Sequence, residues 1–157
     1  MRRESPLPKN VMTREEARLI LKQPDLTTAQ GLRDRALMEV VYSTGIRAGE
    51  ASRLTLYDID FEEGYLRVNQ GKGNRDRVVP IGWMACRYVQ RYLEEARGKL
   101  GGSISDLLFL GRKGEPLSVG RIGGIVRRYV RALGIERPLS THSFRKACAT
   151  EMLRGGA

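Results

Sequence analysis

The stretch YDIDFEEGYLRVNQGKGNRDRVVPI, residues 57–81, decides the fold. Its segments either alternate polar and apolar residues or are short and β-branched, patterns typical of strands: 57–61, 65–69 and 77–81. Glu63-Gly64 predicts the first turn. The segment 71–74 predicts the second, because its glycines readily adopt positive φ. The stretch therefore predicts a small antiparallel sheet of three strands.

Apolar residues outside this stretch recur at helical spacing. Thr13 followed by Glu16 is a capping box that starts a helix, which ends before Pro24. Further helices are predicted over 32–44, from about Arg47 to about Leu54, and over 84–99 and 118–133, and one begins at Ser140 or Thr141. The predicted fold class is α+β, mainly α, a helical domain with one small three-stranded antiparallel sheet.

The helix over 118–133 separates apolar and basic residues most clearly. Its predicted inward face consists of Val119, Ile122, Ile125, Val126, Tyr129, Val130 and Leu133. Its other face carries Arg121, Arg127, Arg128 and Arg131. These arginines are either contacts to a DNA backbone or an ordinary solvated surface.

Composition favours a polyanionic partner. The 157 residues suit one domain, and 28 Lys and Arg against 18 Asp and Glu give a net charge of +10. Such a balance on a foldable chain predicts a polyanionic partner, with nucleic acid as the leading candidate. No apolar run is long enough to span a membrane and no signal peptide is visible, so the expected location is the cytoplasm. Cys86 and Cys148 lack metal-ligand spacing and are expected to be reduced core residues.

The termini suggest how the chain is organised. Residues 1–11 contain Pro6 and Pro8 among charges, as interdomain linkers do. We expect a linker remnant over 1–11 and a partial catalytic domain over 12–157.

Two short motifs contain candidate functional cations. Arg47 lies at the start of a helix, where the macrodipole disfavours a cation, and Glu50 follows three residues later. Arg47 either points at a phosphate, with Glu50 orienting nearby groups, or forms an exposed ion pair with Glu50. Lys72, between two glycines, is either a solvated turn residue or a proton donor on a loop that also carries Arg75 and Arg77.

The third motif is Ser140-Thr141-His142-Ser143-Phe144-Arg145-Lys146. It contains the only histidine of the chain. On a helix, His142 and Arg145 project from the same face, next to the positive N-terminal end of the helix dipole. This arrangement would favour a bound phosphate, although a lone His near an Arg is more often a surface pair.

Together these motifs resemble those of the tyrosine recombinase (phage integrase) family, in order and in context. The matching segments are 43–51, 71–77 with Val79-Pro80, and 142–145. The resemblance implies that Arg47 and Arg145 are the catalytic arginine pair, Lys72 the hairpin lysine and His142 the first active-site histidine. Glu50 matches the acidic residue that accompanies the first arginine. Arg75, Arg77 and Lys146 are the expected DNA contacts.

The implied activity is site-specific recombination or integration of DNA through a 3′-phosphotyrosine, without metal or cofactor. Two guanidinium groups would bind the non-bridging oxygens, a lysine would protonate the leaving 5′-oxygen, and the histidine would assist. The implied partners are DNA and other recombinase protomers.

The chain also departs from the family pattern. Lys146 replaces a histidine, and Glu151 replaces a residue that is often basic or aromatic. The chain ends before the positions of the second His or Trp and of the nucleophilic tyrosine, and an N-terminal DNA-clamping domain is missing. No tyrosine has the nucleophile's context: Tyr42, Tyr57, Tyr65, Tyr88, Tyr92 or Tyr129. We expect a catalytic-domain fragment that is inactive alone; the alternative is a stand-alone basic DNA-binding domain of the same fold.

Overall fold

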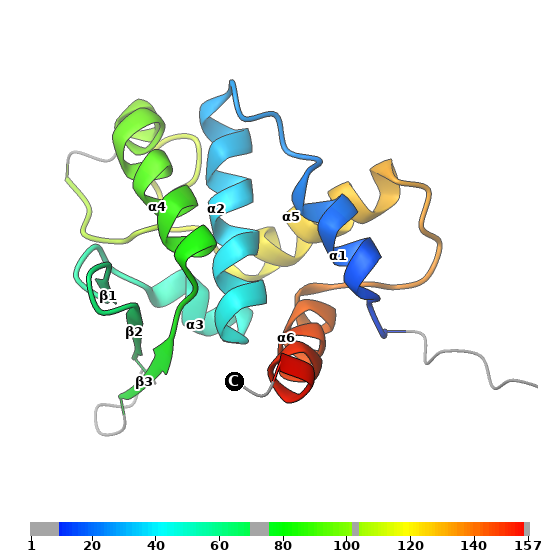
Figure 1. Cartoon of the computed structure of the whole chain (residues 1–157). Helices are drawn as coiled ribbons and strands as arrows, with labels where there is room; N and C mark the ends of the chain where they lie inside the picture. The colour runs from blue at the N-terminus through cyan, green and yellow to red at the C-terminus, as the bar shows by residue number, and fades with distance from the viewer. Residues whose placement is uncertain (1–9, 70–75, 102–103, 156–157) are drawn as a thin grey trace, which may run out of the picture.

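The computed structural model describes residues 10–69, 76–101 and 104–155 (Figure 1). In chain order its helices and strands are α1 (Arg14–Leu21), α2 (Ala29–Thr44), α3 (Ala48–Arg53), β1 (Ile59–Asp60), β2 (Tyr65–Val68), β3 (Arg77–Pro80), α4 (Trp83–Glu95), the 3₁₀ helix η1 (Arg97–Leu100), α5 (Val119–Ala132) and α6 (Thr141–Gly155). The predicted fold class is confirmed, since helices dominate and the described strands form one small sheet.

The sheet has the order β1-β2-β3, and both strand pairs are antiparallel. Gly64 adopts a φ of 74°, which confirms a turn that favours glycine between the first two strands. The first strand is shorter than predicted. The Asp58 carboxylate accepts a hydrogen bond from the backbone N–H of Thr55, 2.8 Å away, so the chain turns there before it extends.

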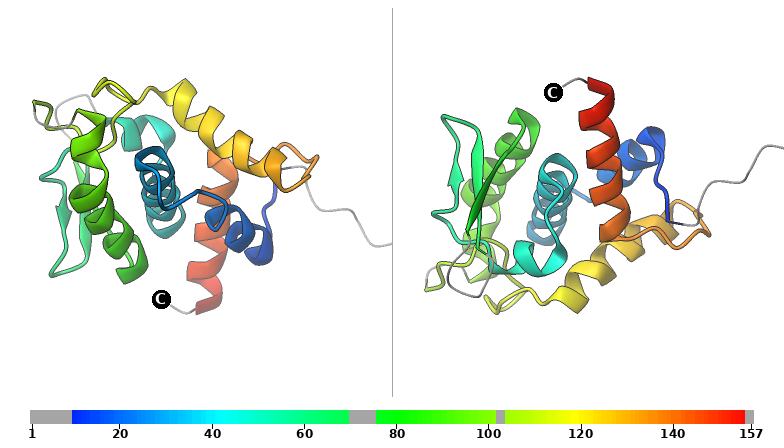
Figure 2. Two further views of the ribbon diagram at one scale, coloured as in Figure 1. Left: turned by 90° about the horizontal axis from the view of Figure 1, so that it is seen from above. Right: turned by 90° about the horizontal axis from the view of Figure 1, so that it is seen from below.

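Helix α2 is the centre of the molecule. Figure 2 shows α4 and the sheet on one side of it and α1 and α6 on the other, with α5 passing along a third side. Its apolar residues are buried, and so are three of its charged residues: Arg33, Asp34 and Glu39. Each has an ionic partner, because a buried charge without one is strongly unfavourable. A helix surrounded on all sides gives the fold its core.

The predicted helix ends are largely confirmed. At α1 the Thr13 hydroxyl accepts from the Glu16 N–H at 3.0 Å, and the Glu16 carboxylate accepts from the Thr13 N–H at 2.9 Å. At α5 the Ser118 hydroxyl accepts from the Arg121 N–H. The prediction that Val119 faces inward was wrong. Its side chain is 53% exposed, because the first turn of α5 extends past the core toward α3.

The elements that carry the candidate site lie on one side of the molecule. In Figure 1, α3, the β2–β3 end of the sheet and α6 all lie toward the lower edge. Helix α2 ends just above them, and Gly45 terminates it in the left-handed conformation with a φ of 72°. This glycine lets the chain reverse directly into α3. In the described part of the chain, every helix is too short or too polar to cross a membrane.

Candidate functional site

Arg47 lies at the N-cap of α3, with extended backbone angles and an exposed side chain. Its backbone N–H donates to Oε1 of Glu50 at 2.8 Å, which ties the residue to the first turn of the helix. The side chain is thus held at a fixed point while its guanidinium stays open to solvent. This arrangement suits a cation whose target lies outside the protein.

Glu50 is buried, with only 3% of the residue exposed. Its two carboxylate oxygens accept from the guanidinium of Arg77 on β3, at 2.6 Å from Nη1 and 3.1 Å from Nη2. Burial raises the pKa of Glu50, but the bonds from Arg77 and the Arg47 N–H outweigh it, so the pKa lies below its ordinary value. The interpretation as an exposed Arg47–Glu50 ion pair is therefore wrong. The buried carboxylate joins α3 to β3 through its hydrogen bonds.

Arg145 on α6 contacts the turn that precedes Arg47. Its Nε donates to the carbonyl oxygen of Gly45 at 2.7 Å, and the side chain is half-buried. His142, three residues earlier on the same helix, is exposed. Residues three apart lie on one helix face, so His142 and Arg145 share the face that meets the Gly45 turn. The structure thus brings the first and third motifs together.

The start of α6 differs in detail from the prediction. The Ser140 carbonyl accepts the first helical bonds, but the hydroxyl that contributes to the cap belongs to Ser143 and accepts from the Ser140 N–H at 3.0 Å. Ser143 is fully buried, whereas His142 beside it faces solvent. The buried serine and Phe144 anchor the first turn and leave the histidine free for a ligand.

The remaining predicted residues are less closely tied to this site. Lys72 and Arg75 lie outside the described residues. Lys146 is exposed next to Arg145. Arg77 lies close to the site, but its guanidinium is engaged by Glu50.

Two contacts of the site were not evident from the sequence. Gly45 terminates α2, and its carbonyl is also the acceptor for Arg145. Cys148, one turn after Arg145, packs below the same turn with Sγ 3.5 Å from the Ser43 carbonyl oxygen. Burial raises the pKa of this thiol, and the thiol is a core residue as predicted. The only hint of these contacts in the sequence was Gly45, a small residue directly before the helix of the Arg47 motif.

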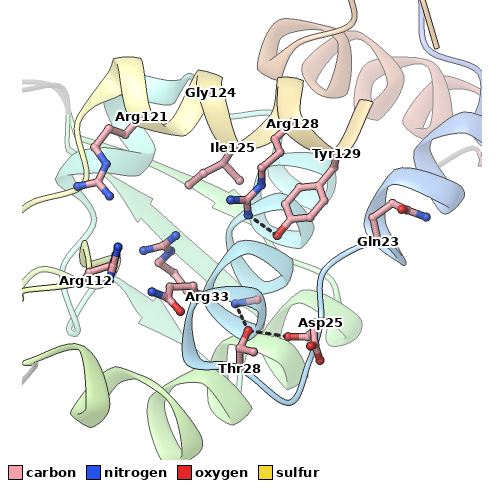
Figure 3. A pocket seen from close by; sticks show the side chains of 12 residues that line it. Gln23, Asp25, Thr28, Arg33, Arg112, Arg121, Gly124, Ile125, Arg128 and Tyr129 are labelled. Atoms are coloured by element: carbon pink, nitrogen blue, oxygen red, sulfur yellow. Dashed lines mark hydrogen bonds between the residues drawn. The ribbon is translucent and has the colours of Figure 1, made fainter. Parts of the chain in front are cut away.

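A second group of arginines surrounds a cavity of about 660 Å³ between α5 and the start of α2. Figure 3 shows Arg33, Arg112 and Arg121 around its opening, with Arg128 bonded to the Tyr129 hydroxyl. Asp34, fully buried, accepts from Arg33, Arg128 and Tyr129, so much of this charge holds α2 to α5. None of Arg47, His142 or Arg145 lines this cavity.

Comparison with known proteins agrees with this geometry. Residues 10–157 match the phage integrase family. The tyrosine recombinase XerC 2 of Ralstonia nicotianae is 44% identical over 96% of this chain and 44% of its own length. The tyrosine recombinase XerD of Pseudomonas putida is 39% identical over 97% of the chain and 51% of its own length. The chain spans about half the length of the curated relatives it matches.

Solved structures give the same answer. The crystal structure of XerA recombinase superposes with a TM-score of 0.83 at 26% identity, covering 100% of this chain and 54% of that one. A post-cleavage complex of XerH site-specific recombinase with palindromic difH substrate gives 0.76 at 26% identity, covering 95% of this chain and 43% of that one. With its fold, its motifs in order and these matches, the chain belongs to the phage integrase family of tyrosine recombinases.

Proposed function

We propose that this chain forms the phosphate-binding part of the catalytic domain of a site-specific DNA recombinase. The observation that carries the proposal is the 2.7 Å bond from Arg145 Nε to the Gly45 carbonyl. It joins the helix of His142 and Arg145 to the turn that leads into Arg47. Two arginines from distant parts of the sequence are thereby held at one turn, as binding of a single phosphodiester requires.

The proposed chemistry uses charge and position. In strand exchange through a phosphotyrosine, negative charge builds up on the non-bridging oxygens of the phosphate. Arg47 and Arg145 would each bind these oxygens, and planar guanidinium groups suit such paired contacts. Arg145 has its Nε engaged by Gly45, which leaves the terminal nitrogens to face the phosphate. This division of donors orients the guanidinium before any ligand arrives.

Proton transfer is assigned by the family pattern. Lys72 would protonate the leaving 5′-oxygen, and His142, exposed one turn before Arg145, would hydrogen-bond the phosphate or assist that transfer. Arg75 and Lys146 would contact the DNA backbone. These residues need no metal or cofactor to stabilise the charge.

The proposed partners are double-stranded DNA and further recombinase protomers. The net charge of +10 supports a polyanionic ligand, and the XerH relative was solved on its difH substrate. A DNA substrate of this kind implies action in the cytoplasm. The proposed domain boundaries are a linker over 1–11 and catalytic-domain residues over 12–157.

Fluorescence anisotropy with a labelled duplex tests the proposal. The expected result is sequence-tolerant binding that weakens steeply between ~50 and ~200 mM salt, because phosphate contacts release counterions. Arg47→Ala and Arg145→Ala should each weaken it about tenfold. The matched control is Arg91→Ala, which removes an arginine paired on the exposed face of α4. Equal losses in all three variants would mean that general charge, and no defined site, binds the DNA.

A further inference from the structure

Two buried carboxylates at the sheet are held in the same way. Asp58 accepts the backbone N–H of Thr55 and two bonds from Arg67 on β2. Glu50 accepts the backbone N–H of Arg47 and two bonds from Arg77 on β3. In both cases an acid fixes a backbone N–H three residues before it, and a strand arginine balances the acid. Only Glu50 accepts its backbone bond from a predicted catalytic arginine, Arg47.

The arrangement of the second pair leaves Arg77 poorly placed for DNA. Its two terminal nitrogens both donate to Glu50, and 38% of its side chain is exposed. A buried carboxylate without a cation is strongly unfavourable, so the free energy lost on removing this guanidinium is larger for Glu50 than for a solvated phosphate. Arg77 therefore has a structural partner that competes with a DNA contact.

A single oxygen connects Arg77 to Arg47. Oε1 of Glu50 accepts both the Arg47 N–H, at 2.8 Å, and Nη2 of Arg77, at 3.1 Å. Oε2 accepts Nη1 of Arg77 at 2.6 Å. Because the guanidinium grips both oxygens, it fixes the plane of the carboxylate and with it the direction of the bond to Arg47.

We propose that Arg77 is a positioning residue, which acts through Glu50 to hold Arg47 at the N-cap of α3 in the direction that phosphate binding requires. This inference rests on the proposed function of Arg47. It replaces the direct DNA contact that the sequence suggested for Arg77. The residue touches neither DNA nor the reacting atoms.

Electrostatics support this role. Among the residues that the structure describes, the charged groups that act on Glu50 are Arg77 from β3 and Arg47 at the start of α3. Burial alone would raise the pKa of Glu50, and the hydrogen bonds from Arg77 are the largest single effect that opposes it. Without Arg77 the carboxylate would take up a proton at a higher pH, and a protonated acid is a weaker acceptor for the Arg47 N–H.

The first test is independent of DNA. In the full chain, NMR follows the Arg47 amide proton while the pH is lowered from 7 to 5. The wild-type signal should stay constant, and Arg77→Ala should shift it, make it titrate and speed its exchange about tenfold. Arg67→Ala, which removes the equivalent arginine from Asp58, should leave the Arg47 amide unchanged. An Arg47 amide that behaves alike in Arg77→Ala and wild type overturns the positioning role.

The second test is a double-mutant cycle on duplex affinity. If Arg77 acts through Arg47, Arg77→Ala weakens binding in the wild type and adds nothing in Arg47→Ala. Arg77→Lys should restore little, because a point charge does not grip both oxygens. Losses that multiply in the double variant, or full rescue by lysine, make Arg77 a direct phosphate contact and refute the proposal.

The two readouts also separate the inference from the function on which it rests. If Arg47→Ala binds DNA like the wild type, the proposed function of Arg47 fails, whether or not the Arg47 amide responds to Arg77→Ala. If Arg47→Ala weakens binding but the amide ignores Arg77, the function stands and the inference fails.

Discussion

Nε of Arg145 lies 2.7 Å from the carbonyl oxygen of Gly45, a hydrogen bond between residues 100 positions apart. It links the helix that carries His142 directly to the turn that leads into Arg47. The acceptor is a backbone atom of a residue with a φ of 72°. The direction of that carbonyl, and thus the position of Arg145, depends on a conformation that favours glycine.

Gly45→Ala should therefore damage the site as well as the fold. The left-handed conformation is expected to cost alanine about 1 to 2 kcal/mol, although its Cβ would meet Cys148 Sγ only at an ordinary 3.5 Å. Relief of this strain would rotate the Gly45 carbonyl away from Arg145. We expect lower stability in chemical denaturation and weaker duplex binding under conditions where the variant is fully folded.

Gly134→Ala is the matched control. Gly134 also has a left-handed φ, 74°, just after α5, and nothing within 4 Å would meet its Cβ. It should lose similar stability and keep the wild-type affinity for DNA. If both variants bind DNA equally, the Gly45 carbonyl does not position Arg145.

Asp34 should be the most sensitive charged residue of the core. It is fully buried and accepts bonds from Arg33, Arg128 and Tyr129. Asp34→Ala would leave the buried guanidinium of Arg33 without its counter-ion, a change that typically destabilises by about 3 to 5 kcal/mol. Urea denaturation measures the loss. Glu95→Ala, which breaks the exposed pair with Arg91, should change stability by less than about 0.5 kcal/mol. A similar small loss at Asp34 would contradict its role in joining α2 to α5.

Acid should destabilise the fold through Glu16 and Glu50. Burial raises the pKa of each, but in both the bonds from an arginine and a backbone N–H prevail, so both folded pKa values lie below the ordinary one. The folded chain thus binds fewer protons than the unfolded chain, and stability falls as the pH drops from ~4.3 through the folded values. Thermal melts between pH 7 and 3 measure this. Arg137→Ala should lower the stability at neutral pH and make the loss in acid smaller, because Arg137 is one cause of the lowered pKa of Glu16.

Much of the fold could be predicted because local patterns determine it. The capping box at Thr13, the turn at Gly64 and the alternation in β2 each depend on neighbouring residues, and all three are confirmed. The central position of α2 could not be predicted in this way. Its charged residues are buried only because partners such as Leu110 and Arg128 arrive from 77 and 94 positions away.

In the candidate site, too, some features could be predicted from the sequence and others depend on distant residues. The order of the motifs identified Arg47 and Arg145, and their elements meet as that order implies. The bonds from Arg145 to Gly45 and from Arg77 to Glu50 could not be read from spacing, because each joins segments whose approach depends on the packed core. The roles of these residues in catalysis stay predictions.

The tyrosines of the chain differ in how well they could serve as nucleophiles. The hydroxyls of Tyr92 and Tyr129 are engaged by the Leu108 carbonyl and by Asp34. Burial raises the pKa of both to about 12, with Asp34 contributing at Tyr129. Tyr42 is half-buried and packs its ring against Phe144. Tyr57 and Tyr65 are the exposed ones, at 74% and 49%.

These positions bear on whether the chain can cleave DNA. In-line attack requires a hydroxyl within about 3 to 3.5 Å of the phosphorus, and such positioning is worth ~7 to 11 kcal/mol. We expect residues 1–157 to bind a nicked suicide duplex but to form no covalent adduct with it. If no tyrosine of the chain is held in line with the phosphorus, Arg47 and Arg145 have no transition state to stabilise. The measurement is a denaturing gel of the reaction. A band of protein attached to DNA that Tyr57→Phe or Tyr65→Phe abolishes would show that an exposed tyrosine of this chain is the nucleophile.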